Sequence, residues 1–536
     1  MTPDRRSFAG VSARELAGLT GILVLAAILR FVALPTRGRW DADQGHDMLT
    51  LLELTQRGVV PLLGPPTSIG DFHHGVLYYF LLAPAAWLSG SDPVAVTGMI
   101  ALAGIAAVAV TWWLARSIGG PVAALIAGLL MATSAAAVDE STFIWNPNLI
   151  ALSSSIALAA AWRAWSAPPG VARPLAWVVA FAGAIATMHC HVLGSVLAPA
   201  IVVPWILDVR RRDPAGRRRL LIAGGIGLLL LILSYVPLLV HELQTNFSEV
   251  QAALAFLSGG GEPSSMSLPV RFLVVGLRVL AWPLVGLITE APVAAILAAA
   301  GVIAAVGWRS AAADDAGERR AARWFGLTLL WTTAALTVAA SGLATVVPSL
   351  PNDHYHAFAD PIVFVTVGLG LAALARLPHD ARVVAGADRT LPPLGAIVAG
   401  AIVVGIVGFN LVRQPPLISP DGGWPGGDAA AQRVLDALGD VPASEDVVLH
   451  SLPDFKSGDA LRFPLVHRGA SVPELDALPA YDGLPNVVIC DDLFQEAIGA
   501  PCGGPAEDAR VAPYGQRLID RFEAAPDRWI SVYVPG

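Results

Sequence analysis

The sequence predicts a polytopic α-helical membrane protein that ends in a small α/β domain. Of its 536 residues, 55% are hydrophobic and 14% are charged, and the mean hydropathy is +0.62. A soluble domain has no core large enough to hold this much apolar surface, whereas a bilayer accommodates it in helices of about 20 residues. The net charge of −8 argues against a nucleic-acid partner.

Eleven apolar segments are predicted to span the membrane. Arg5, Arg6 and Arg14 precede the first, and no cleavage pattern follows it, so we expect an uncleaved helix with a cytoplasmic N-terminus. Two further runs, 76–90 and 270–286, are predicted to lie in the interface, because spanning would put basic loops outside. The eleven spans are 15–34, 94–115, 121–138, 148–165, 174–189, 191–208, 220–240, 288–308, 324–346, 360–376 and 394–412.

This arrangement predicts an integral protein of the plasma (inner) membrane with most of its polar residues on the extracytoplasmic side. Four loops are expected there, together with the C-terminus. Ionisable residues gathered in loops on one side of the membrane indicate a candidate functional site there. The predicted loops are 35–93, 139–147, 241–287 and 347–359.

The composition changes after the last span, where eight proline and glycine residues lie between positions 415 and 427. The chain is therefore predicted to divide into a membrane domain (1–413), a linker (414–428) and a soluble extracytoplasmic domain (429–536). Cys490 and Cys502 lie close together in this last part and are expected to form a disulfide. Within it we expect helices over 429–438 and 515–522 and strands over 446–450, 486–490 and 530–534.

The polar stretch from Trp40 to Tyr79 gathers carboxylates and imidazoles at the membrane surface, which favours acid–base chemistry or ion binding. Asp41 and Asp43 are two residues apart and can face one cation or one substrate; the alternative is a solvated loop in which Asp43 or Asp47 caps a helix. Tyr78 has the position of an interfacial anchor. The ionisable residues of the stretch include Asp41, Asp43, His46, Asp47, Asp71, His73 and His74.

Histidines in this stretch and in later loops are candidate ligand-binding residues. His73 and His74 could bind a phosphate or a metal, or they could bond loop carbonyls. His354 and His356, with Tyr355 between them at a span entrance, suit an anionic headgroup. His189 and His191 flank Cys190, which is too few ligands to predict zinc. In the second loop, Asn146 is a candidate helix cap before Pro147, and Asn148 is expected to face the same surface as Asp43.

The order of these parts resembles the GT-C class of membrane glycosyltransferases, in the branch of protein O-mannosyltransferases and bacterial aminoarabinose transferases. The resemblance covers about residues 15–412 and is carried by the acidic first loop, by Leu77-Tyr78-Tyr79 and by Trp145-Asn146-Pro147-Asn148. The family's catalytic aspartate falls on Asp43. Gln44 stands where the family has glutamate, and Asn148 stands where it has aspartate.

The resemblance implies an inverting transfer of a sugar from a polyprenyl-phosphate donor to a hydroxyl of an acceptor glycan, lipid or protein. Asp43 would be the general base, and His354, His356 and His73 or His74 would stabilise the phosphate. Whether a divalent cation takes part is left open. Together, the residue patterns and the resemblance give these candidate substrate-binding residues: Asp41, Gln44, His73, His74, Tyr78, Asn146, Asn148, His354, Tyr355 and His356.

Two other functions compete with the transferase. A transporter or flippase of a lipid-linked or anionic substrate would also need buried ionisable groups, but it would place them mid-span and often shows repeated halves. Here the charges lie in loops on one side, and no clear repeat is present. A membrane part that serves only as a scaffold for the C-terminal domain is the third possibility, which Gln44 and Asn148 keep open.

Overall fold

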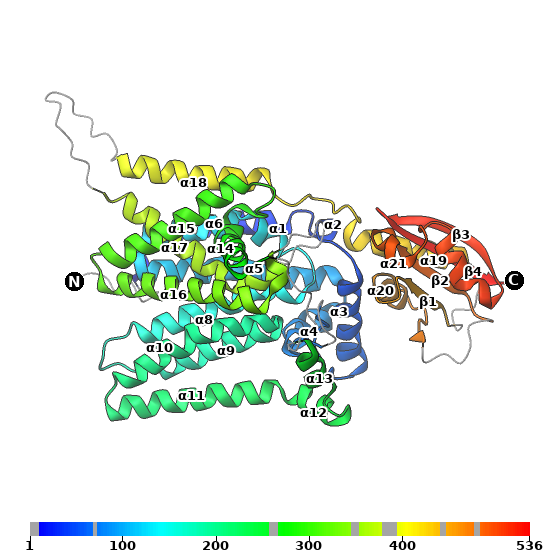
Figure 1. Cartoon of the computed structure of the whole chain (residues 1–536), viewed down its shortest axis with the longest axis horizontal. Coiled ribbons are helices and arrows are strands. Elements are labelled where there is room, and N and C mark those ends of the chain that lie inside the picture. The colour runs from blue at the N-terminus through cyan, green and yellow to red at the C-terminus, as the bar shows by residue number, and fades with distance from the viewer. Residues whose placement is uncertain are drawn as a thin grey trace.

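The computed structural model describes residues 10–67, 72–256, 266–344, 353–377, 394–439, 446–475 and 483–536. It consists of a helical bundle and, at one end of the bundle, a small domain with a four-stranded sheet (Figure 1). The predicted fold class is thereby confirmed.

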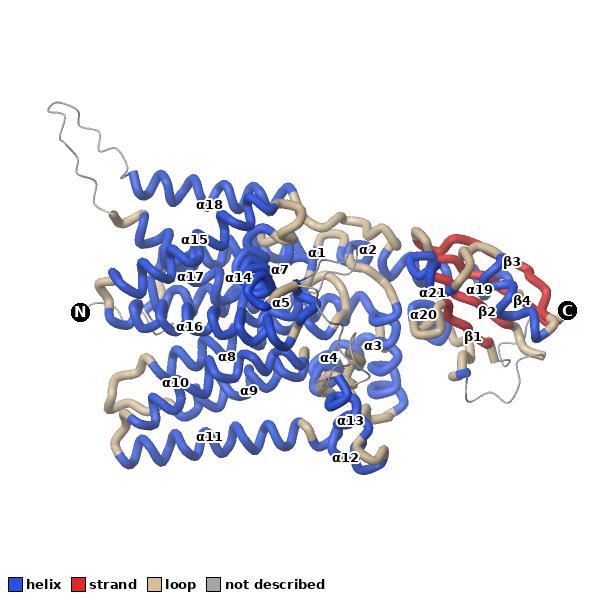
Figure 2. The backbone as a smooth tube through the Cα atoms, viewed as in Figure 1, coloured by secondary structure: helices blue, strands red, loops and turns tan. Residues whose placement is uncertain are grey.

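Each of the eleven predicted spans falls on a helix of the bundle, and the long helices run side by side (Figure 2). Apolar runs of this length form helices in a membrane because all their backbone groups must be paired internally. The helices are α1 (Ala13–Phe31), α5 (Pro93–Gly119), α6 (Pro121–Thr133), α8 (Ile150–Trp165), α9 (Pro174–Cys190), α10 (Ala198–Arg210), α11 (Pro214–Ser234), α15 (Pro292–Ala312), α16 (Ala316–Ala339), α17 (Asp360–Leu374) and α18 (Leu394–Val412).

Within the described ranges, six helices are long and apolar enough to cross a membrane, and a bent pair, α11 with α12 (Val236–Gln244), adds a seventh. The chain is an integral multi-pass membrane protein. Helix α4 (Leu77–Ser89) and helix α6 have 13 residues each, fewer than the roughly 20 of a straight span, so length alone does not separate the predicted interfacial run from the predicted span. Helix α14 (Leu268–Val285), by contrast, is long and apolar enough to span, although the sequence pattern favoured an interfacial position for it.

Shorter elements connect the long helices. Several of them lie at the end of the bundle that faces the C-terminal domain, and α3 lies between the bundle and that domain (Figure 1). They are α2 (Leu34–Arg37), α3 (Ala42–Leu52), the π-helix η2 (Glu53–Arg57), α7 (Ala135–Asp139), α13 (Ser248–Ala255) and the 3₁₀ turns η3 (Asn146–Leu149), η4 (Val192–Leu197), η6 (Ser341–Ala344) and η7 (Asp353–Ala359).

Helix α3 begins with a capping box. The Asp41 carboxylate accepts the N–H of Ala42 at 2.8 Å, and Gln44 Oε1 accepts the N–H of Asp41 at 2.9 Å. These contacts pair N–H groups that the helix itself leaves free and so fix its first turn. Because neighbours on a helix face are three and four residues apart, the cap places Asp43, His46 and Asp47 on one face.

The C-terminal domain has one sheet of four strands in the order β1-β2-β4-β3. Strands β1 and β2 are parallel and the other pairs are antiparallel. Helix α19 starts at Gly423, inside the predicted linker, and we count it with this domain. The elements are α19 (Gly423–Leu438), β1 (Val448–Leu452), α20 (Asp459–His467), β2 (Asn486–Asp491), η9 (Asp492–Phe494), α21 (Gln495–Ile498), α22 (Pro505–Val511), η10 (Ala512–Tyr514), β3 (Gln516–Ala525) and β4 (Arg528–Pro535).

The helix predicted over 515–522 is wrong, because this segment forms strand β3. Its apolar residues at 518, 519 and 522 have helical spacing, which is why the sequence favoured a helix. In the structure β3 pairs with β4, and its register shifts between Leu518 and Asp520 and again between Glu523 and Ala525. Such irregularities break the alternation by which a strand is recognised, and pairing with β4 overrides the local preference.

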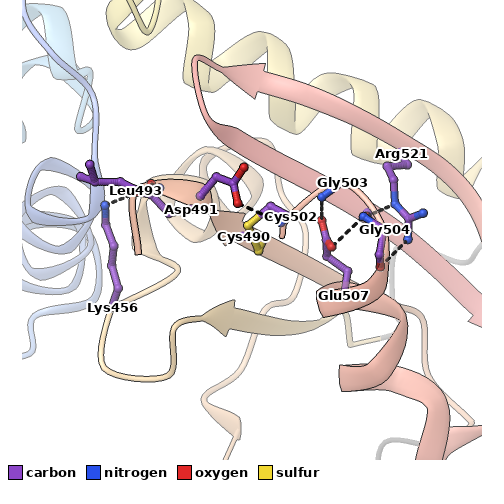
Figure 3. Close-up of a disulfide and its surroundings, with 11 residues drawn as sticks. Lys456, Cys490, Asp491, Leu493, Cys502, Gly503, Gly504, Glu507 and Arg521 are labelled. Atoms are coloured by element: carbon purple, nitrogen blue, oxygen red, sulfur yellow. Dashed lines mark hydrogen bonds and ion pairs between the residues drawn. A yellow bond between two sulfur atoms is a disulfide. The ribbon is translucent and has the colours of Figure 1, made fainter. Parts of the chain in front are cut away.

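A disulfide joins Cys490 at the end of β2 to Cys502, with 5.7 Å between their Cα atoms (Figure 3). The third cysteine, Cys190, is buried in the bundle and free. Beside the disulfide, Lys456 donates to Asp491 at 2.5 Å (Figure 3). The disulfide thus fixes the strand end that carries Asp491, whose partner Lys456 also pairs with Asp41 of the membrane part.

Candidate active site

A pocket lies where α3, the second loop, the start of η4 and η7 meet. These segments are far apart in the sequence and bring carboxylates, imidazoles and aromatic rings to one place. Polar groups that converge in a concave, largely apolar site are typical of a ligand pocket. The lining includes Asp43, His46, Asp47, Pro65, Pro66, Thr67, Phe72, His74, Trp145, Asn146, Pro147, His191, Val192, Leu193, Phe256, Ala339, His354 and Tyr355.

Asp43 lies in the first turn of α3, and its exposed side chain lines the pocket. The pKa of Asp43 is raised, first because the surrounding protein displaces water and second because the negative charge of Asp41 is near. His46, Lys456 and Trp145 act in the opposite direction. A carboxylate with a raised pKa in a pocket is a candidate proton acceptor.

Asp47 is held differently from Asp43, one helical turn away. It is buried, and its two carboxylate oxygens accept the hydroxyls of Tyr78 and Tyr79, each at 2.9 Å. Burial raises the pKa of Asp47 to about 7. Because both of its oxygens are engaged, Asp47 is suited to anchor α4 against α3, which leaves Asp43 as the accessible carboxylate.

Across the pocket from Asp43, segments from four parts of the chain supply a cluster of aromatic and imidazole rings. The His191 ring lies 4.6 Å from that of His74, 4.9 Å from that of Tyr355 and 5.3 Å from that of His354, centroid to centroid. Trp145 extends the cluster, 4.4 Å from His354. Burial lowers the pKa of His74 to about 3, so that its ring is neutral near pH 7. This wall therefore offers hydrogen bonds and ring faces to a ligand.

No protein-family model matches the chain, and no curated protein matches it by sequence. Solved structures do match its fold. ArnT from Cupriavidus metallidurans in the apo state matches with a TM-score of 0.60 and 15% identity, over 97% of this chain and 98% of its own. The chain has the GT-C fold.

Two further structures have the same GT-C fold. ArnT from Cupriavidus metallidurans bound to undecaprenyl phosphate has a TM-score of 0.56 and 17% identity, over 97% of this chain and 98% of its own. The apo oligosaccharyltransferase of Archaeoglobus fulgidus has a TM-score of 0.51 and 12% identity, over 97% of this chain and 74% of its own. At these identities the likeness is one of fold.

Five of the residues that the sequence singled out for the GT-C resemblance line the pocket: Asp43, His74, Asn146, His354 and Tyr355. They come from four separate segments. The fold thus brings the first-loop aspartate to the same cavity as the late histidine and tyrosine. Asp71 lies outside the described residues.

The other predicted residues do not line the pocket, and each has a structural contact instead. The backbone N–H and Nδ1 of His73 both contact the Glu249 carboxylate of α13, at 2.7 and 3.0 Å. Gln44 Nε2 donates to the Ile144 carbonyl at 2.7 Å, and Asn148 Nδ2 to that of Phe143 at 2.8 Å. Tyr78 is bound to Asp47. His356 is fully buried, with Nδ1 3.7 Å from the Asp360 carboxylate.

Asp41 belongs to an ion cluster between the two parts of the chain. Its carboxylate accepts from Arg528 at 2.6 Å and from Lys456 at 3.2 Å, and Asp491 accepts from Lys456 as well. The pairs lie at the contact of α3 with the C-terminal domain. Asp41 ties this domain to the helix that carries Asp43, and its contact with substrate stays a prediction.

Sequence reasoning did not include His46, Asp47, Trp145 and His191 among the site residues. The signal for the first two was their spacing of three and four from Asp43. His191 and Trp145 carried no signal of their own, because their neighbours in the pocket come from distant segments. Among the residues that the structure describes, no three His, Cys, Asp or Glu side chains are arranged to hold a metal ion.

We expect Asp41→Asn to shift the acidic limb of a pH–activity profile to lower pH. If ionised Asp43 is the base, the rate falls as pH drops through the raised pKa of Asp43. Removing the Asp41 charge takes away one cause of that rise, while Asn keeps the helix cap. The measurement is kcat/KM against pH. Asp491→Asn, from the same ion cluster, should leave the limb in place; an unmoved limb in Asp41→Asn would contradict the assignment.

Proposed function

We propose that the protein is an inverting glycosyltransferase that moves a sugar from a polyprenyl-phosphate donor to an acceptor hydroxyl at the extracytoplasmic face of the membrane. The observation that carries the proposal is an accessible carboxylate, Asp43, in a polar pocket of a GT-C fold. The match to ArnT bound to undecaprenyl phosphate supports a polyprenyl carrier, and it extends over nearly the whole of both chains. The acceptor class remains a glycan, a lipid or a protein.

Asp43 is the general base of the proposed reaction. The acceptor oxygen attacks the anomeric carbon, its proton passes to Asp43, and the bond from that carbon to the phosphate oxygen breaks with its electron pair on the phosphate. Attack from the side opposite the phosphate inverts the configuration. Asp43 suits the role because its exposed side chain lines the pocket and its pKa is raised.

The leaving phosphate is stabilised by hydrogen-bond donors on the other pocket wall, from His74, His354 and Tyr355. The membrane part (1–413) carries this chemistry. The C-terminal domain, outside the cytoplasm in this proposal, docks on α3 through the Asp41 ion cluster.

The test is sugar release from a panel of radiolabelled polyprenyl-phosphate sugars, offered to the purified protein in lipid with a mixture of glycan, lipid and peptide acceptors. We expect one donor to be consumed with release of polyprenyl phosphate and formation of a labelled product. Proteoliposomes that contain only this protein would overturn the proposal if they took up an anionic substrate in an ion-driven way without consuming any donor. That result would favour a transporter.

A further inference from the structure

The described residues that line the pocket include no permanently charged cation. None of the described residues that line it is Arg or Lys. The His74 ring is neutral near pH 7, because burial lowers its pKa to about 3. Two carboxylates, Asp43 and Asp47, lie in the same lining. A phosphate that entered would meet negative charge on this side unless another group offset it.

His46 is the pocket group whose surroundings favour a positive charge. It lies one helical turn after Asp43, and its Nδ1 is 3.1 Å from Asp459 Oδ2 of the C-terminal domain. Burial disfavours the charged ring, but the hydrogen bond to Asp459 and the charges of Asp47, Asp459 and Asp43 outweigh it, so that the pKa of His46 is raised. Nδ1 is taken by Asp459, and the contacts described for His46 leave Nε2, on the opposite edge of the ring, for a ligand.

The position of Asp459 is built into the contact between α20 and α3. Gly45 faces the Asp459 carbonyl so closely that a Cβ at position 45 would lie 1.9 Å from that oxygen. The first residue of α20 therefore rests directly on α3, beside His46. The Asp459 N–H donates to Ser457 Oγ at 3.1 Å, which fixes the turn that presents the carboxylate.

Two neighbouring contacts hold the same arrangement. Trp40, just before α3, donates its indole N–H to the Ala460 carbonyl at 2.8 Å. Lys456 and Arg528 bind Asp41 at the start of the helix. Contacts on both sides of Asp459 thus fix the C-terminal domain against α3. The docked fold therefore sets the distance between His46 and Asp459.

We propose that Asp459 of the C-terminal domain orients His46 so that its Nε2–H binds the anionic phosphate of the donor. Asp459 is a positioning residue, and His46 is the residue that touches the ligand. The C-terminal domain then completes the site. The inference rests on the proposed function in taking the ligand to be a polyprenyl phosphate.

The experiment measures the affinity of the full-length protein in lipid nanodiscs for undecaprenyl phosphate and for undecaprenol, which lacks the phosphate. We expect His46→Gln and Asp459→Asn each to weaken binding of the phosphate by roughly 10- to 100-fold, the value of a hydrogen bond to a charged group. Binding of undecaprenol should not change. The double variant should lose little beyond either single variant, because the two residues act as one unit.

Asp520→Asn is the matched control, since Asp520 pairs with Arg433 at 2.8 Å within the C-terminal domain and does not line the pocket. It should bind both lipids like the wild type. A lowered unfolding temperature of Asp459→Asn would show that this substitution detaches the domain. In that case the phosphate affinity of His46→Gln, measured in protein whose domain is docked, tests the proposal.

The proposal would be overturned if the wild-type protein bound the two lipids equally. It would also be overturned if the affinity losses of the two single variants multiplied in the double variant. The outcome is separate from that of the transfer assay. A protein that shows ion-driven uptake and consumes no donor, but needs His46 and Asp459 to bind the phosphate, would refute the proposed function and support this anion site.

Discussion

Replacing Asp43 by Asn is expected to lower sugar transfer by about 10²- to 10⁴-fold, the usual contribution of a general base. Asn has nearly the same shape but cannot accept the acceptor's proton. Asp47 cannot take over, because it is buried and bound to Tyr78 and Tyr79. The loss should appear in the transfer step, because Asp43 acts on the acceptor, whereas a change in donor affinity would reflect the action of the Asp43 charge on His46. The measurement is single-turnover transfer at saturating donor, with donor affinity measured separately.

Asp139→Asn provides the matched control. Asp139 is the last residue of α7, lies 3.7 Å from Arg39 and does not line the pocket. We expect this variant to transfer sugar like the wild type. Full transfer by Asp43→Asn would remove the assignment of the base, and an equal loss in both variants would point to a general effect of charge on the loops.

Trp40→Ala is expected to destabilise the docked C-terminal domain by about 3–5 kcal/mol, the range for truncating a buried tryptophan. Trp40 is 3% exposed and packs against Trp424 of α19 and Phe463 of α20, with ring centroids 4.6 and 5.8 Å away. Its indole N–H also pairs with the Ala460 carbonyl. The residue therefore joins the membrane part to helices α19 and α20 of the domain.

The measurement is thermal unfolding in detergent, combined with proteolysis under native conditions. Trp40→Ala should lower the unfolding temperature and open the linker to cleavage. Trp40→Phe loses the indole N–H and part of the ring surface but keeps a ring against Trp424, so the destabilisation should be clearly smaller. Equal effects of the two variants would show that packing of this ring does not hold the domain.

Most of the helical fold could be predicted from the sequence, because each apolar run is long enough to identify a helix by itself. Strand β3 could not. Its shifted register hides the alternation of a strand, and only the partner β4 reveals it. Helix α3 illustrates an intermediate case: an acidic cap was expected, but the capping residue proved to be Asp41.

The candidate site was predictable in part. Asp43 stood out as an acid in a short polar loop of an apolar chain, and His354 and Tyr355 stood out at the start of a span. The pair of His46 and Asp459 could not be found, because 413 residues separate them. The charge and hydrogen bonds of a histidine depend on the residues that lie next to it in the fold. A single sequence does not show which segments meet there.

Lys456 is the only lysine in the chain, and it lies at the contact between the C-terminal domain and Asp41. Apart from the N-terminus, every amine-directed reagent therefore has a single target, and that target is the joint between the two parts of the protein. The rate at which such a reagent modifies this one amine would report on docking without any engineered tag, because the group is paired with Asp41 and Asp491 while the domain is docked.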